Sequence, residues 1–141
     1  MRLIVNGLTG APAETTVPPA NIGSQCRGER NGCFKYDYSW EQTDATLTLT
    51  FNTRILISQN LSAAELQEVR EHESHHYQDF FRLARQLQNA ISRALGANRD
   101  PDMDNRLVWF DYDVCEAGAA FHRSAGRIPA ICIPPGGARP M

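Results

Sequence analysis

Hydrophobic and polar residues alternate along the first part of the chain and adopt a longer period after residue 61. Period-two patterns cover residues 34–40 and 47–51, and shorter apolar runs occupy 3–5 and 54–58. Such patterns are typical of half-buried strands. Residues 7–32 are rich in Gly, Pro, Thr and Asn and predict a long irregular segment. The first 58 residues therefore predict a small, mostly antiparallel sheet.

The period changes at Ser62, where the sequence SAAE forms a capping box. The Ser62 side chain can accept a hydrogen bond from the backbone of Glu65, whose side chain can reach back to Ser62. Apolar residues then recur every three or four positions, and Gly96 is a natural stop. This pattern predicts one helix of about 33 residues, about 50 Å long.

A second helical pattern runs from residue 107 to residue 123. The tail, residues 124–141, reads as extended, with one more short strand at 130–133. A chain of 141 residues is enough for one ordinary domain. We therefore expect a single α+β domain in which the small, mostly antiparallel sheet packs on the long helix and on a second, C-terminal helix.

Composition excludes some classes of partner. The formal net charge is −2, which argues against a nucleic-acid partner held by phosphate contacts. No apolar run approaches the roughly 20 residues needed to span a bilayer. The N-terminal apolar stretch is too short for a signal-peptide core, so we expect either a cytoplasmic start or a leader that has been removed.

The chain has four cysteines, an even number that permits two disulfides in an exported protein. The sequence CRGERNGC could be closed by Cys26–Cys33, and Cys115–Cys132 would then tie the second helix to the tail. Four reduced, unrelated thiols are the alternative. Four-cysteine zinc binding is disfavoured because the chain has no C-x-x-C pair.

The apolar stripe of the long helix is interrupted by Glu73 and His76, with His72 one turn before. Burying an unpaired carboxylate or imidazole costs several kcal/mol. The sequence HESHH fits H-E-x-x-H, in which histidines at i and i+4 share a helix face and can bind one metal ion. Glu73 is then placed to act as general base on a water molecule. The alternative is a solvated polar stretch in which Glu73 pairs with nearby basic residues.

This motif and its setting resemble the zincin superfamily of metallopeptidases. The order of strands, motif helix and second helix is also similar to small bacterial proteins classed as secreted zinc-dependent proteases. The resemblance covers about residues 34–123, but only the five motif residues are specific. It implies a zinc ion held by His72 and His76, with Glu73 as the catalytic base.

A catalytic zinc ion usually takes a third protein ligand. Glu116, in the sequence EAGAAF, resembles the second-helix glutamate of gluzincins, and small residues there would let the two helices approach. Asp113 and His122 are the alternatives for the third ligand. Candidate donors to the oxyanion are Tyr77, Tyr112, His122 and Arg123. The strands at 47–51 or 54–58 could align a peptide substrate along their edge.

A second candidate site lies in the sequence DPDMDNRLVWFD. Its aspartates, Asp100, Asp102, Asp104 and Asp111, stand at positions 1, 3, 5 and 12 of an EF-hand-like loop. Oxygen-rich loops with this spacing suit calcium. The alternative is an acidic loop that caps the second helix.

The sequence leads us to expect a zinc metallopeptidase that acts on a peptide or protein substrate. It would be secreted or exported, as an enzyme or as an effector or toxin domain, and a cytoplasmic protein is the alternative. A second hypothesis is a non-catalytic metal-binding or interaction module with a structural zinc ion. A third is a zinc hydrolase that acts on a bond other than a peptide.

Overall fold

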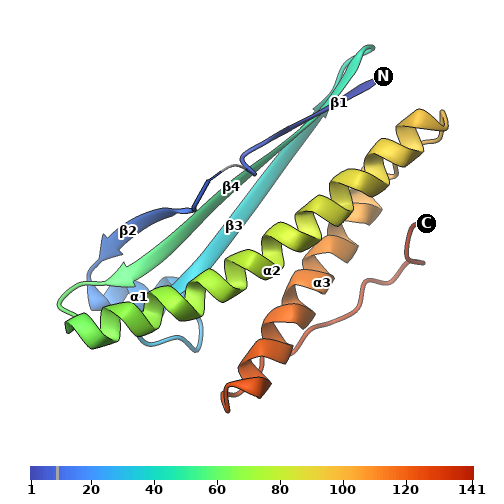
Figure 1. The fold of residues 1–141 in the computed structure, drawn as a ribbon. Coiled ribbons are helices and arrows are strands. Elements are labelled where there is room, and N and C mark those ends of the chain that lie inside the picture. Colours follow the sequence, from blue (N-terminus) through green and yellow to red (C-terminus); the bar gives the residue numbers. More distant parts are fainter. Residues whose placement is uncertain (9) are drawn as a thin grey trace.

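The protein forms two layers, a sheet and a pair of long helices (Figure 1). The computed structural model describes residues 1–8 and 10–141. The elements in chain order are β1 (Arg2–Asn6), β2 (Ala13–Val17), α1 (Pro19–Gln25), β3 (Gly32–Gln42), β4 (Thr46–Ser58), α2 (Ala63–Gly96) and α3 (Met103–Ser124).

Strand β4 is the centre of the sheet. β3 pairs with it in antiparallel register along 11 residue pairs, from Gly32↔Ile57 to Gln42↔Leu47. β1 and β2 pair with the other edge of β4, and both run parallel to it. The predicted mostly antiparallel sheet is therefore wrong, because two of the three strand pairings are parallel.

The error has a physical cause in residues 7–32. Parallel strands need a long crossover connection, whereas antiparallel strands can be joined by a short hairpin. Residues 7–32 were expected to be irregular, but they contain β2 and α1. The chain reverses between β2 and β3 and again between β3 and β4, so β4 runs in the same direction as β1 and β2. Gly7 makes the first bend at φ +87°, where a Cβ would lie 1.9 Å from the carbonyl oxygen of Phe51.

Strand β4 is also longer than predicted. The expected strands at 47–51 and 54–58 form one continuous strand of 13 residues. Its residues Leu47, Leu49 and Phe51 are buried toward the helices, whereas Leu56 packs with Ile22 of α1 on the opposite face. Period-two alternation places these side chains on their two faces.

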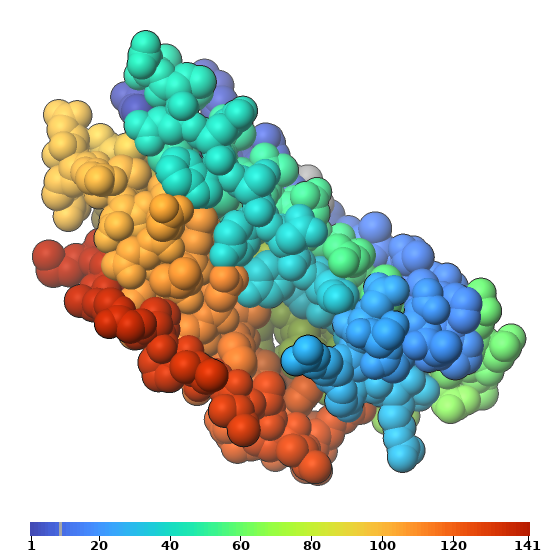
Figure 2. Space-filling model, turned by 180° about the vertical axis from the view of Figure 1, so that it is seen from behind, coloured from blue at the N-terminus to red at the C-terminus, as the bar shows by residue number. Residues whose placement is uncertain are grey.

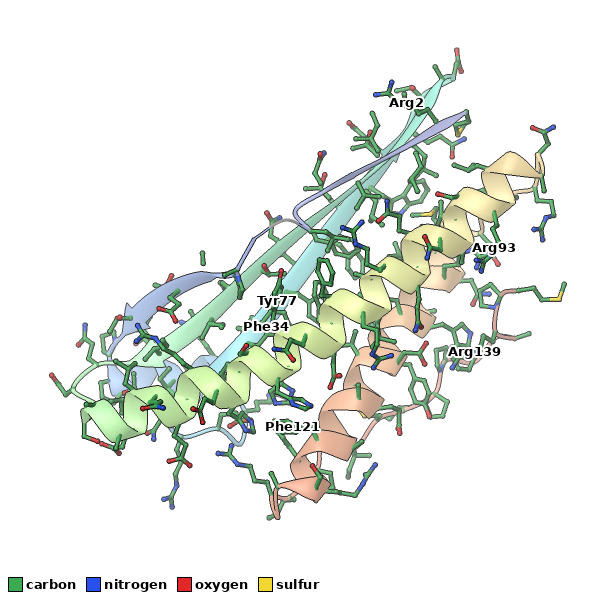
Figure 3. The ribbon with its side chains drawn as sticks, in the orientation of Figure 1. Arg2, Phe34, Tyr77, Arg93, Phe121 and Arg139 are labelled. Carbon is green, nitrogen blue, oxygen red and sulfur yellow. A yellow bond between two sulfur atoms is a disulfide. The ribbon has the colours of Figure 1, made fainter. Side chains whose placement is uncertain are left out.

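Helix α2 begins with the predicted capping box, in which the Ser62 hydroxyl accepts from the Glu65 backbone and the Glu65 carboxylate accepts from the Ser62 backbone. Its apolar face packs on the sheet through Phe80, which is fully buried among the rings of Phe34, Tyr36 and three further aromatic residues. Figure 3 shows Phe34 and Tyr77 in the layer between the sheet and α2. This aromatic core fixes α2 on the sheet.

Helix α3 runs back along α2 in the opposite direction (Figure 1). It starts at Met103, earlier than the predicted residue 107, and ends at Ser124. Its C-terminus forms a Schellman motif around Gly126, in which the Gly126 N–H donates to Arg123 and the Arg127 N–H donates to His122. This motif sets the position of Arg127 from the end of α3.

The tail lies along α3 without the predicted strand at 130–133. Arg139 holds it, because its guanidinium forms two hydrogen bonds with Asp113 and stacks over the Trp109 ring at 4.3 Å. Both predicted disulfides, Cys26–Cys33 and Cys115–Cys132, are present. The first closes a loop next to β3, and the second ties the tail to α3.

Candidate metal centre

Two histidines of the H-E-x-x-H sequence lie one turn apart on the face of α2 that meets α3. The Nε2 atoms of His72 and His76 are 3.1 Å apart. His75 points elsewhere, since its ring stacks on Phe121 and its Nε2 lies 3.6 Å from the carboxylate of Asp79. The i, i+4 spacing thus brings together the two imidazoles that the sequence singled out.

The third imidazole comes from α3. The Nε2 atom of His122 lies 2.9 Å from that of His76 and 3.3 Å from that of His72. α3 approaches closely here because Gly118 faces the His76 ring, where an added Cβ would meet the ring atoms at 3.6 and 3.7 Å. Phe121 points from α3 toward α2 (Figure 3), and its ring packs on His72 and His76.

A carboxylate from the loop between Cys26 and Cys33 completes the group. The Oε1 atom of Glu29 lies 3.2 Å from Nε2 of His122 and 3.7 Å from Nε2 of His72. One ligand atom from each of Glu29, His72, His76 and His122 lies within 4.8 Å of all the others, and the four could hold a metal ion. We refer to these four residues as the His3Glu group.

The imidazoles of α2 are held in the neutral form that binds metals. Burial, and then the charge of Arg127, lower the pKa of His72 to about 4. Burial is also the main reason why the pKa of His76 is lowered to about 4, with the neighbouring His72 next. A neutral imidazole presents one nitrogen lone pair, which is the form that binds a metal ion.

The three nitrogens cannot all be hydrogen-bonded to one another. Each Nε2 atom either carries a hydrogen or presents a lone pair, so at most two of the three contacts between them can be hydrogen bonds. The remaining contact must place two like groups together at 3.3 Å or less. A cation between them removes this conflict, because all three can then present lone pairs. The donor set of three imidazoles and a carboxylate therefore fits a metal ion.

Glu73 lies beside the group and is not one of its four members. It is 1% exposed, its Oε1 atom lies 3.9 Å from Nε2 of His72, and its Oε2 atom has no hydrogen-bond partner among the described residues. Burial raises the pKa of Glu73 to about 8, and the charge of Glu29 acts in the same direction. A buried carboxylate oxygen without a partner is costly in a structural position.

Two cavities flank the His3Glu group. The larger, of about 840 Å³, is lined by the Cys26–Cys33 loop, the first turns of α2 and residues 126–130. The smaller, of about 260 Å³, lies between the start of β3 and α3 and is lined by His76 and Gly118. Figure 2 shows the surface hollowed between the loop and β3 on one side and α3 on the other. Glu73 and His122 line both cavities, so the site is open to a ligand from two directions.

The other predicted site residues lie elsewhere. Glu116 is not part of the group that the described residues form, and Asp113 is engaged by Arg139. The Tyr77 hydroxyl donates to the carbonyl of Gly10, and Tyr112 packs edge-on against Trp109. Of the candidate oxyanion donors named at the sequence level, His122 is the one that lines the two cavities, and it does so as a member of the His3Glu group.

The four aspartates of the predicted calcium site do not share one loop. α3 starts at Met103, so Asp104 and Asp111 lie in a helix and not in a loop. Asp111 accepts hydrogen bonds from the hydroxyls of Tyr36 and Tyr38. Asp100 accepts from the backbone of Asp102, which precedes the helix as its N-cap residue. The alternative was an acidic loop that caps the helix, but the side chain of Asp102 forms no capping hydrogen bond.

Sequence reasoning missed Glu29 and Arg127. The only sequence feature that points to Glu29 is its position inside a short loop bounded by two cysteines. The feature that points to Arg127 is the preceding Gly126, a typical residue just after a helix end. Neither signal says that the side chain meets the histidines, because the loop and the end of α3 are about 100 positions apart in the chain.

Comparison with known proteins adds no assignment. No family model, curated protein or solved structure matches this chain. The described helices also include none that is long and apolar enough to cross a membrane. Conclusions about function therefore rest on the His3Glu group, Glu73 and the two cavities.

Proposed function

We propose that this protein is a zinc-dependent hydrolase of the H-E-x-x-H type that cleaves peptide bonds. The observation that carries the proposal is the convergence of three imidazole nitrogens beside a buried carboxylate with a free oxygen. A zinc ion in such a site lowers the pKa of a bound water molecule and polarises a carbonyl group.

Each residue then has a role that follows from its position. His72, His76 and His122 bind the ion through Nε2, and Phe121 packs on two of these rings and restricts their rotation. Glu73 is the general base, because its carboxylate lies next to His72 and has an oxygen free to take a proton from water. The same carboxylate can deliver that proton to the leaving amine.

Strand β3 is the favoured place for an extended substrate. Its residues pair with β4, and the structure describes no strand on its other edge. Residues 33–36 of this strand line the smaller cavity beside His76. β4, which contains both strands proposed from the sequence, has partners on its two edges and cannot accept another strand. A peptide could add to β3 through backbone hydrogen bonds.

The two disulfides favour an oxidising compartment. We extend the proposal accordingly to a secreted or exported enzyme, including an effector or toxin domain.

One experiment tests the catalytic role directly. Glu73→Gln should keep one metal ion per chain by elemental analysis, and it should lower hydrolysis of fluorescently quenched casein by roughly 10²- to 10⁴-fold. Glu71→Gln is the matched control, because Glu71 is an exposed glutamate of the same helix. A Glu73→Gln protein with full metal and undiminished hydrolysis would contradict the proposal.

A second function is favoured by one observation. Glu29 adds a fourth protein ligand, and sites closed by four protein ligands are typical of structural zinc. A structural zinc ion supplies folding energy, so a chelator should then unfold the protein. For the catalytic site we expect the chelated protein to remain folded by circular dichroism, held by its aromatic core and its two disulfides.

A further inference from the structure

The position of Glu29 raises a question that the proposed function leaves open. A catalytic zinc ion keeps one coordination position for water or substrate. Here the Glu29 carboxylate competes with water or substrate for that position, since its Oε1 atom lies close to two of the three imidazoles. An ion bound by all four residues would have no position left for a ligand from outside.

The other oxygen of Glu29 is also engaged. The Nη1 atom of Arg127 donates to Glu29 Oε2 at 2.9 Å, and the same Nη1 atom lies 3.4 Å from His72 Nε2. The Glu29 carboxylate therefore bridges the imidazole cluster and a guanidinium group. A carboxylate in this arrangement occupies the place that an oxyanion from outside would take, with one oxygen toward the metal position and the other toward an arginine.

The two partners in this bridge are held by different means. Glu29 is in a loop that the buried Cys26–Cys33 disulfide closes, and its backbone N–H donates to the carbonyl of Cys26. Arg127 is placed by the Schellman motif at the end of α3. The loop can release its glutamate side chain by a change of rotamer, while Arg127 stays at the edge of the larger cavity.

From this geometry we propose that Glu29 is a displaceable fourth ligand that closes the metal centre to small oxyanions. When Glu29 leaves, an incoming carboxylate takes its place, bound on one side by the metal ion and on the other by Arg127. The inference rests on the proposed metal binding and deepens it, because it names the class of ligand that competes for the site and the residue that binds it.

Cobalt(II) and acetate provide a test that does not depend on hydrolysis. Cobalt(II) reports a change of its ligands in the visible spectrum, and acetate is the side-chain group that Glu29→Ala removes. We expect acetate to shift the cobalt spectrum of Glu29→Ala in a saturable manner. It should shift that of the wild-type protein only at much higher concentrations, because it must first displace Glu29. Adding Arg127→Ala to Glu29→Ala should weaken acetate binding about ten-fold, which is the effect of losing a hydrogen bond to a charged group.

Glu68→Ala is the matched control, because Glu68 is another glutamate that lines the larger cavity. It should behave as the wild type. If Glu29→Ala is too unstable by circular dichroism, Glu29→Gln replaces it, since an amide is a weaker ligand than a carboxylate.

The outcomes separate this inference from the proposed function. Equal acetate binding by the wild type and Glu29→Ala would overturn the inference, as would a Glu29→Ala protein that binds cobalt but not acetate. Loss of cobalt from both Glu29 variants would also overturn it, because Glu29 would then be an indispensable ligand. If the wild type takes up no cobalt, the proposed function itself fails, and the inference fails with it.

Discussion

Helix α3 contributes to two groups of polar side chains, and only in one of them can all the contacts be hydrogen bonds. In the first, Asp111 accepts hydrogen bonds from Tyr36 at 2.8 Å and from Tyr38 at 2.5 Å. In the second, His122 meets two other imidazoles in contacts that cannot all be hydrogen bonds. Buried polar groups in proteins are nearly always paired, so an unsatisfied group needs an explanation.

The contrast separates a group that links elements of the fold from a group that could hold a metal ion. The Asp111 group links α3 to β3 and needs nothing from outside. The His3Glu group, with Glu73 beside it, lies between two cavities and leaves a carboxylate oxygen without a partner among the described residues. Strongly shifted pKa values occur in both regions, so a shift alone would not have separated them.

The largest effect is expected from removing His122. His122→Ala should weaken zinc binding by at least about a hundred-fold, because it deletes a ligand and not merely a group that supports one. Isothermal titration calorimetry measures the loss. Glu116→Ala, which removes the carboxylate favoured by the sequence alone, should bind zinc as the wild type does. If Glu116→Ala lost zinc affinity and His122→Ala kept it, Glu116 would be the third ligand.

A smaller effect is expected at Gly118, which lies against the His76 ring. Gly118→Leu should displace that ring and weaken zinc binding about ten-fold, the size of effect seen when support of a metal-bound histidine is disturbed. Gly118→Ala is the matched control, since its added Cβ would sit at ordinary contact distance, 3.6 Å from the ring. Unchanged calorimetry for the leucine variant would mean that helix spacing does not control the site.

A substitution in the Asp111 group should change the free energy of unfolding and leave metal binding unchanged. Asp111→Ala removes the acceptor of two hydroxyl groups and should lower the free energy of unfolding by about 2 kcal/mol. Urea denaturation measures this loss, with zinc affinity as the second readout. A large loss of zinc affinity would show that the two groups are coupled through α3.

The smallest expected effect is a pH dependence from the same tyrosines. Burial, and then the charge of Asp111, raise the pKa of Tyr36 above its ordinary value. The pKa of Tyr38 is raised by burial and by its hydrogen bond to Asp111. The folded state therefore keeps protons that the unfolded state loses above about pH 10. The contribution of the two tyrosines to the free energy of unfolding should be constant below this pH and fall as pH rises further. In Asp111→Asn the fall should be shallower, and an identical slope would contradict this account.

Much of the secondary structure could be predicted from the sequence because it depends on local patterns. The capping box at Ser62 and the apolar repeat define α2 without reference to other elements. The parallel pairing of β1 and β2 with β4 could not be predicted from the sequence. It depends on a short strand and a short helix within residues 7–32, and the composition of that segment predicts irregular structure. The prediction of a strand at 130–133 was wrong. Those residues lie along α3 and pair with no strand in the part of the chain that is described.

The same division holds for the candidate site. The helical spacing is enough to place His72 and His76 on one face with Glu73 next to them, since helical geometry sets residues four apart one above the other. That His122 and Glu29 join them, and that Glu116 does not, follows from the tertiary packing. Those choices depend on how α3 and the Cys26–Cys33 loop meet α2, and such long-range packing is set by the whole core and not by the spacing of any one motif.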